Sequence, residues 1–501
     1  MKRNNLLTGA LILSVGGVLS KIFSAVYRIA LTRILGGEGI GIYQLVFPFY
    51  SLLVVLATAG LPLAISKVIS KHKESEGKIL KKCLVLTSVF SLVLTLILLL
   101  LSKTIASFQG KPEITICYIL LAPTIIIVSV ASVLRGYFQG RQNFTPSAVS
   151  NILEQFIKLA LGLTLSLALV KISLMASIIG AMVSIVVSEI VSIIVLLIYF
   201  KKREINNNSS VEIKTKEILK DVLPITLTSI IMPIASFVDS LIVVNLLVNN
   251  FSRGAAIYLY GLESGAVSNL ISLPTIFSFA IASVLLPNIS GAKVGYNQNH
   301  KLTIALKIVM IICVPCVLCF LLVPEKLIYL LYGNKLDGYG FNGLVVARQL
   351  LTLSGLGVAF LSVNQLYSSC LQAVDKRGAT VRNLSIAVVI KFALEILFLP
   401  TKINIYALAI SNTICYLTAM LLNHVEMREV FKMKLDFIFI AKLIVCNSLL
   451  LLSLLIMLNV GNSAINILTA IMVSGVVYLT SLYAIKIFTN KDTAMLKYRK
   501  H

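Results

Sequence analysis

Apolar runs long enough to span a membrane recur along the whole chain, and this recurrence limits the possible folds more than any other feature. Residues 84–101, for example, read LVLTSVFSLVLTLILLLL without a single charge. At 1.5 Å per residue, about 20 helical residues cross roughly 30 Å of hydrocarbon. The strands of a membrane barrel would instead alternate polar and apolar residues over about 10 positions, and these runs do not alternate. The sequence therefore predicts an all-α integral membrane protein.

The composition agrees with a bilayer environment, since 58% of the 501 residues are hydrophobic and only 13% are charged. Comparing the apolar runs with their polar flanks predicts about fourteen membrane-spanning helices. They are expected at 6–33, 41–66, 83–102, 114–134, 148–170, 173–199, 222–248, 266–287, 303–323, 345–369, 380–399, 403–422, 437–458 and 464–486.

The basic residues predict the orientation of these helices. The formal net charge is +24, and most Lys and Arg residues fall in the loops on one side of the predicted membrane. With the N-terminus inside, the cytoplasmic segments are 67–82, 135–147, 200–221, 288–302, 370–379, 423–436 and the tail from 487. The positive-inside rule then predicts that both termini are cytoplasmic in a bacterial inner membrane. The same distribution accounts for the charge without a nucleic-acid partner.

The longest polar stretch, residues 201–220, predicts a linker between two lobes. Gln139–Lys158 also registers with Gln372–Lys391, which places glutamine on glutamine and lysine on lysine. We therefore predict two parallel six-helix repeats, a known construction for transporters. The expected parts are an N-terminal lobe (1–220), a C-terminal lobe (221–436), and two added helices with a cytoplasmic tail (437–501).

Two cations in the first predicted span are candidates for substrate binding. Each charge at the membrane centre costs about 3 kcal/mol or more, so it is expected to face protein or water. Lys21 and Arg28 are seven residues apart, which places them on one face of a helix. The alternative for Arg28 is that its long side chain extends to the membrane surface.

Further intramembrane charges occur in the fifth, seventh and eleventh spans. Glu154 and Lys158 can pair locally, as can Lys391 and Glu395, because each pair is four residues apart on a helix. These pairs are either structural, or they hold two repeat-related lysines that face a shared cavity. Asp239 has no partner within four residues, which makes it a candidate for gating or ion coupling. Glu189 and Arg348 are expected at the membrane interface instead.

The balance of these charges favours an anionic substrate. The cations are Lys21, Arg28, Lys158 and Lys391, and the acids are Asp239, Glu154 and Glu395. A pyrophosphate group would gain charge-assisted hydrogen bonds from such cations in a partly desolvated cavity.

Several activities are disfavoured by what the sequence lacks. It has no G-x-x-x-x-G-K-[ST] loop for nucleotide hydrolysis, and its four histidines fall in predicted cytoplasmic segments. Cys313, Cys316 and Cys319 have a metal-like spacing but lie inside a predicted span, so we interpret them as packing residues. We expect no metal, no cofactor and no enzymatic activity.

Four segments resemble the polysaccharide-transporter branch of the multidrug/oligosaccharidyl-lipid/polysaccharide (MOP) superfamily, and more narrowly the stage V sporulation protein B and MurJ-like lipid II flippases. They are Ser20–Gly36, Gly60–Lys67, Arg135–Gly140 and Leu273–Ser290. The resemblance implies two six-helix lobes, alternating access, and a groove for a polyprenyl tail formed by the last two helices. Lys21 matches a family position that is often Arg and serves headgroup binding. The chain departs from MurJ-like proteins at Ser268 and Asn269, where those proteins tend to carry a further Arg.

The sequence thus predicts a flippase that moves a polyprenyl-diphosphate-linked envelope precursor to the outer leaflet. Lipid II for peptidoglycan, including the spore cortex, is the expected cargo. The partners are this lipid-linked glycan, membrane lipids, a coupling cation (Na⁺ or H⁺) and envelope-synthesis proteins. Two alternatives remain: a cation-coupled multidrug antiporter of the same superfamily, and a non-transporting scaffold for envelope synthesis.

Overall fold

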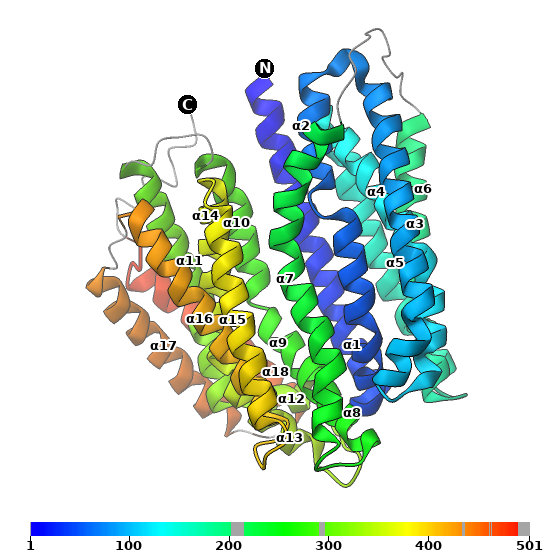
Figure 1. The fold of residues 1–501 in the computed structure, drawn as a ribbon. Coiled ribbons are helices and arrows are strands. Elements are labelled where there is room, and N and C mark those ends of the chain that lie inside the picture. The colour runs from blue at the N-terminus through cyan, green and yellow to red at the C-terminus, as the bar shows by residue number, and fades with distance from the viewer. Residues whose placement is uncertain are drawn as a thin grey trace. The chain divides into compact units, whose positions relative to one another are not determined.

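The computed structural model describes residues 2–201, 215–289, 296–432, 436–459, 461 and 463–488. Over these residues the regular elements are all helical (Figure 1). Most of the predicted linker and of the C-terminal tail lies outside the described residues. By the packing of its helices the chain divides into two compact units. Unit 1 comprises Met1–Asn269 with Ile396–Ile405, and unit 2 comprises Leu270–Glu395 with Tyr406–His501.

Unit 1 contains the predicted intramembrane charges Lys21, Arg28, Glu154, Lys158 and Asp239. Its helices are α1 (Lys2–Thr58), α2 (Leu61–Lys71), α3 (Glu76–Phe108), α4 (Thr115–Gly140), α5 (Thr145–Leu169), α6 (Leu174–Lys201), α7 (Thr215–Leu247), α8 (Arg253–Gly261), the π-helix η3 (Leu262–Val267) and the start of α9 (Ser268–Ser272), with short 3₁₀ turns η1 (Lys73–Ser75) and η2 (Pro112–Ile114).

Helix α1 covers the first two predicted spans, and a glycine separates its two halves. Gly36 has φ 68° and ψ −173°, a backbone conformation that other residues rarely adopt. The start of α1 and helix α2 lie at the same end of unit 1 in Figure 1, so the two halves of α1 run in opposite directions. The predicted loop between the first two spans is therefore reduced to this single break. The predicted second span is also interrupted, because α1 ends at Thr58 and α2 begins at Leu61.

The second half of α1 packs very closely on α8 and η3 through glycines. A Cβ added to Gly41 would lie 2.2 Å from the carbonyl oxygen of Ile257, and one added to Gly261 would lie 2.2 Å from the carbonyl oxygen of Gly37. Gly37 and Gly41, like Gly261 and Gly265, form the G-x-x-x-G spacing that lets membrane helices approach each other. Residues 249–265 lie between the predicted spans 222–248 and 266–287 and outside the predicted cytoplasmic segments, which predicts an outer loop, and this prediction was wrong. The glycines instead allow a buried helix there.

The π-helix also requires a partner for its displaced backbone groups. Gln44 on α1 donates its side-chain amide to the carbonyl oxygen of Ser264 at 2.5 Å. Such π segments occur frequently at functional sites. Here the segment ends at Val267, immediately before the residues that bring Asn269 to Arg28.

Unit 2 contains the remaining helices, except for the last three residues of α15, which belong to unit 1. They are α10 (Thr275–Ile289), α11 (Tyr296–Leu322), α12 (Pro324–Tyr332), α13 (Gly343–Gly355), α14 (Gly357–Ala373), α15 (Arg377–Phe398), α16 (Tyr406–Val430), α17 (Phe437–Leu458) and α18 (Ala464–Ala484). The predicted span 345–369 is bent by 43° between α13 and α14. Glycines on both sides of Leu356, at 355 and 357, weaken the helix at this point.

The C-terminal helices α17 and α18 belong to unit 2, and a proline inside α11 helps to hold α18. Pro315 lies inside α11 and has no N–H for the carbonyl of Ile311, four residues earlier. Tyr478 of α18 donates its hydroxyl hydrogen to that carbonyl at 2.8 Å. The tyrosine thus satisfies a backbone group that the proline leaves without its helical partner.

The described chain has ten helices long and apolar enough to cross a membrane, or twelve if each of two bent helix pairs is one span. The first of the ten, Ile12–Lys71, includes both halves of α1. Helix α15 is not among the ten, because it carries Arg377, Arg382, Lys391 and Glu395. The predicted all-α membrane fold is confirmed, whereas the count of fourteen spans and the lobe boundary near residue 220 stay predictions.

Candidate functional site

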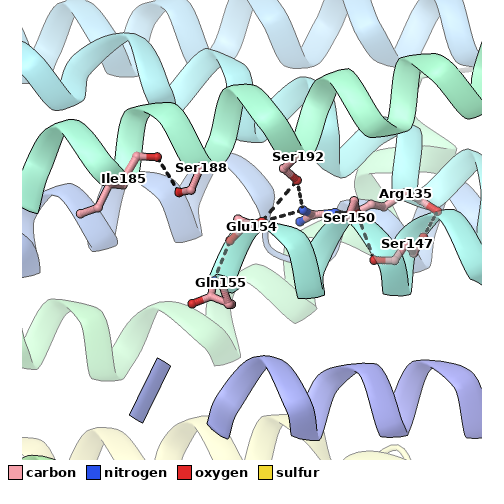
Figure 2. A network of polar contacts seen from close by, with 8 residues as sticks. All are labelled: Arg135, Ser147, Ser150, Glu154, Gln155, Ile185, Ser188 and Ser192. Atoms are coloured by element: carbon pink, nitrogen blue, oxygen red, sulfur yellow. Dashed lines mark hydrogen bonds and ion pairs between the residues drawn. The ribbon is translucent and has the colours of Figure 1, made fainter. Parts of the chain in front are cut away.

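A partly buried network of polar side chains joins helices α4, α5 and α6 of unit 1. Arg135 of α4 donates to the Glu154 carboxylate of α5 at 2.8 Å and to the Ser192 hydroxyl of α6 at 2.7 Å. It also donates to the Ser150 hydroxyl at 3.3 Å, and Gln155 donates to the other oxygen of Glu154 at 2.8 Å. Figure 2 shows these side chains converging from the three helices. The charge of Arg135 is therefore compensated locally, and the three helices are tied together.

Arg135 reaches this position because α4 continues to Gly140, beyond the predicted end of the fourth span at residue 134. Arg135 was predicted to begin a cytoplasmic loop, and this prediction was wrong, because it lies within α4. Gly136 and Gly140 lie against Pro62 and Ile69 of α2, where a Cβ would lie within 3.0 Å of them. Close packing on these glycines allows the helix to continue past Arg135.

Lys158 lies one turn after Glu154 on α5 and faces aromatic rings of α1. Its Nζ is 5.9 Å from the centroids of both Tyr27 and Phe47. Glu154 was expected to form a local ion pair with Lys158, and this prediction was wrong. The Glu154 carboxylate pairs with Arg135 instead. Lys158 still lies within electrostatic range of Glu154 and Arg28.

Arg28 and Lys21 lie on the first half of α1. Arg28 is exposed, and its guanidinium carbon is 5.7 Å from the centroid of Phe47, the same ring that Lys158 contacts. It donates to the side-chain oxygen of Asn269 at 3.5 Å, and Asn269 in turn donates to the carbonyl of Gly265. Lys21 is half-buried. Arg28, Lys158 and Arg135 thus gather within one unit, and Arg28 is the member most open to a ligand.

Glu189 of α6 is a second acid beside this network, and the sequence analysis placed it wrongly at the membrane interface. It lies in the middle of α6 and is only 9% exposed. It interacts electrostatically with Glu154, Arg135 and Lys158. Its Oε2 atom has no hydrogen-bond partner among the described residues.

Asp239 lies elsewhere in unit 1, half-buried on α7. The adjacent Ser240 is buried and accepts a hydrogen bond from Gln109 at 3.1 Å. Two residues before Asp239, Phe237 stacks on Phe49 of α1 with ring centroids 4.6 Å apart. Asp239 is thus held on a helix that packs tightly against the second half of α1.

In unit 2 the predicted pair on α15 forms. The Nζ of Lys391 lies 3.5 Å from the Glu395 carboxylate, and both side chains are almost fully buried. Ser411 of α16 donates to the same carboxylate oxygen at 3.0 Å. Arg348, which is expected at the membrane interface, is exposed and pairs with Glu325 at 2.9 Å, and its position relative to the membrane stays a prediction.

The cysteines offer no metal centre in the described part of the chain. Cys313, Cys316 and Cys319 are free thiols on α11, and the described residues contain no group of three or more His, Cys, Asp or Glu side chains that could hold a metal ion.

Sequence reasoning missed Arg135, Glu189 and Ser192 as members of the cluster. Arg135 stands in one of the segments that carry the family resemblance, and this was the available signal. Ser192 gave none, because serines are common in these helices and bond mainly to their own backbone, as Ser188 does to Ile185.

An all-helical membrane fold with a cluster of basic side chains inside one unit is typical of a transporter of charged molecules. The family model described as "Polysaccharide biosynthesis protein" matches residues 6–293, and the chain belongs to this family. The resemblance seen in the sequence is thereby confirmed.

Individual relatives agree with this assignment. The chain is 27% identical to the uncharacterized membrane protein YabM of Bacillus subtilis (strain 168), over 98% of this chain and 95% of YabM. It is 26% identical to stage V sporulation protein B of the same organism, over 79% of this chain and 78% of the relative. A solved structure of the lipid II flippase MurJ in an inward closed conformation aligns with a TM-score of 0.71 and 17% identity, covering 94% of this chain and 98% of MurJ. The chain therefore shares the fold of MurJ.

Proposed function

We propose that this protein is a flippase that moves a polyprenyl-diphosphate-linked precursor of the cell envelope from the cytoplasmic to the outer leaflet by alternating access. Lipid II is the proposed cargo. The proposal includes a bacterial inner-membrane location with cytoplasmic termini and no catalytic chemistry of the protein's own. The partners are the lipid-linked glycan, membrane lipids, a coupling cation and proteins of envelope synthesis.

The observation that supports it best is the position of Arg28 and Lys158. Both cations lie within 6 Å of the centroid of one aromatic ring, Phe47, and Arg28 is exposed on the first half of α1. In the described part of the chain neither cation has a carboxylate at ion-pair distance, and the nearby Glu154 is already bound by Arg135. Both positive charges are therefore suited to bind a diphosphate, with guanidinium and ammonium donors at close range.

The other proposed roles follow the same reasoning. Lys21, which lies on the same face of α1 as Arg28, is proposed as a further contact for the anionic headgroup. Lys391 in unit 2 is proposed as another. Asp239, Glu154 and Glu395 are proposed to act in gating or ion coupling. An inside-negative potential would favour outward movement of the anion by about 2.3 kcal/mol per charge per 100 mV if that charge is not compensated.

The proposal can be tested in bacterial cells depleted of their own lipid II flippase. The measurement is the amount of lipid II exposed in the outer leaflet, at equal membrane abundance of each variant. We expect the parent chain to restore exposure, and Lys21→Glu and Arg28→Gln to reduce it at least tenfold, about 1.4 kcal/mol or more of lost interaction. Arg348→Gln is the matched control, since it removes a cation that pairs at the surface of unit 2.

The outcomes separate the alternatives. If the protein is a scaffold, the parent chain and Arg28→Gln should support cell growth equally well. Lipid II exposure should then not depend on Arg28. If the parent chain restores no exposure, lipid II is the wrong cargo.

A further inference from the structure

Glu189 differs from Glu154, the acid bound by Arg135, in how its carboxylate is bound. Both oxygens of Glu154 accept hydrogen bonds, one from Arg135 and Ser192 and the other from Gln155. Glu189 is buried in the middle of α6, and its Oε2 atom has no hydrogen-bond partner in the described chain. A buried carboxylate with an unpartnered oxygen is costly when ionised, and protonation removes much of that cost.

The charged and titratable groups around Glu189 come from each helix that packs against α6. Helix α5 contributes Glu154 and Lys158, and α4 contributes Arg135. Helix α1 contributes Tyr50, whose hydroxyl accepts a hydrogen bond from Thr124 at 3.1 Å. Among these groups Arg135 is bound by Glu154, so Lys158 is the cation left to balance an ionised Glu189.

An anion bound at Lys158 would remove this balance. The cluster holds three cations and two carboxylates: Arg135 and Lys158 interact with both Glu154 and Glu189, and Arg28 interacts with Lys158. The cluster therefore carries one excess positive charge when Glu189 is ionised and two when it is protonated. A diphosphate bound by Lys158 and Arg28 adds negative charge beside Glu189. This charge disfavours the ionised form of Glu189.

We propose that Glu189 is the proton acceptor that links proton uptake to anion binding in unit 1. When the diphosphate of the substrate binds at Arg28 and Lys158, a proton moves from solvent onto the Glu189 carboxylate, and the anion and the proton are held together. No other bond is made or broken. By linkage, a protonated Glu189 strengthens anion binding by the same factor that the anion strengthens protonation. This inference rests on the proposed function, because it assumes that the cluster binds a diphosphate.

The test uses the purified full chain and farnesyl diphosphate as the probe. Isothermal titration calorimetry in buffers of different ionisation enthalpy measures the protons taken up for each anion bound. We expect the parent chain to take up about half a proton to one proton more than the Glu189→Gln variant, which retains binding. The dissociation constant of the parent should rise by up to about tenfold per pH unit relative to that of Glu189→Gln as the pH increases. The comparison cancels the titration of the diphosphate itself.

Two further variants keep the result interpretable if Glu189→Gln folds poorly. Glu189→Asp retains a carboxylate and should retain the proton uptake. Glu325→Gln removes an exposed carboxylate of unit 2 and should behave as the parent does.

Each other outcome counts against a different part of the account. Binding to the parent with the same proton uptake as Glu189→Gln would overturn the inference and leave the diphosphate site standing. If farnesyl diphosphate does not bind the parent chain at all, the proposed function fails and the inference fails with it.

Discussion

Removing Arg135 should destabilise unit 1 chiefly by leaving Glu154 as a buried, uncompensated charge. The two side chains are only 16% and 13% exposed, and they meet at 2.8 Å. Breaking a buried pair by removing one partner costs about 3–5 kcal/mol, and these partly hydrated side chains should lie near the lower value, about 3 kcal/mol. Arg135→Met should therefore be much more harmful than the loss of an exposed cation.

The expected shift in melting temperature follows from the size of the unit. Unit 1 has about 280 residues, and an unfolding entropy of about 2.1 cal/mol/K per residue gives about 0.6 kcal/mol/K. A loss of about 3 kcal/mol then lowers the melting temperature by about 5 °C. A thiol-reactive fluorescent dye can follow this melting, because Cys83 and Cys117 of unit 1 are free and buried.

A double-mutant cycle tests the physical reason. If the uncompensated carboxylate causes the loss, Arg135→Met combined with Glu154→Gln should recover at least about half of the stability lost by Arg135→Met alone. If the two losses simply add, the charge argument is refuted. The hydrogen bonds to Ser150 and Ser192 would then account for the effect.

Two further predictions concern helix packing, and both are read from melting temperatures in detergent. Gly41→Ala should lower stability by more than about 1 kcal/mol, because its Cβ would meet a backbone carbonyl of α8, whereas Gly475→Ala, with open space around it, should be neutral or stabilising. Equal effects of the two alanines would contradict the close approach of α1 and α8. Tyr478→Phe should cost about 1 kcal/mol by leaving the carbonyl of Ile311 without its partner, and Tyr483→Phe, at a residue 88% exposed, should cost almost nothing. If Tyr478→Phe has no effect on the melting temperature, water or another group must satisfy the Ile311 carbonyl.

The membrane fold could be predicted because hydropathy depends on the composition of each run and needs no tertiary information. The ends of the helices could not. Residues 249–265 contain Asn, Ser, Arg and several glycines, which read as a loop in sequence, yet glycines at 261 and 265 provide the close contact that buries this segment. A G-x-x-x-G pair in each of two segments was the missed signal.

The candidate site was predicted only in part, for a related reason. Local spacing identified Lys391 with Glu395 correctly, because an i,i+4 pair needs only one helix. The same rule failed for Glu154, since a cation on another helix had better access to its carboxylate. Arg135 and Glu189 join the cluster through the packing of three helices, and no spacing within one helix encodes that.

The central claim is that the cations of unit 1 carry a lipid-linked diphosphate across the bilayer. Reconstituted vesicles test it most directly, by measuring how fast fluorescent lipid II on the inner face becomes accessible to a quencher added outside. The account predicts rapid exposure with the parent chain and with Arg348→Gln, and at least a tenfold slower rate when Arg28→Gln and Lys158→Gln are combined. Exposure at the parental rate without these two cations, or no exposure above that of empty vesicles with the parent chain, would contradict it.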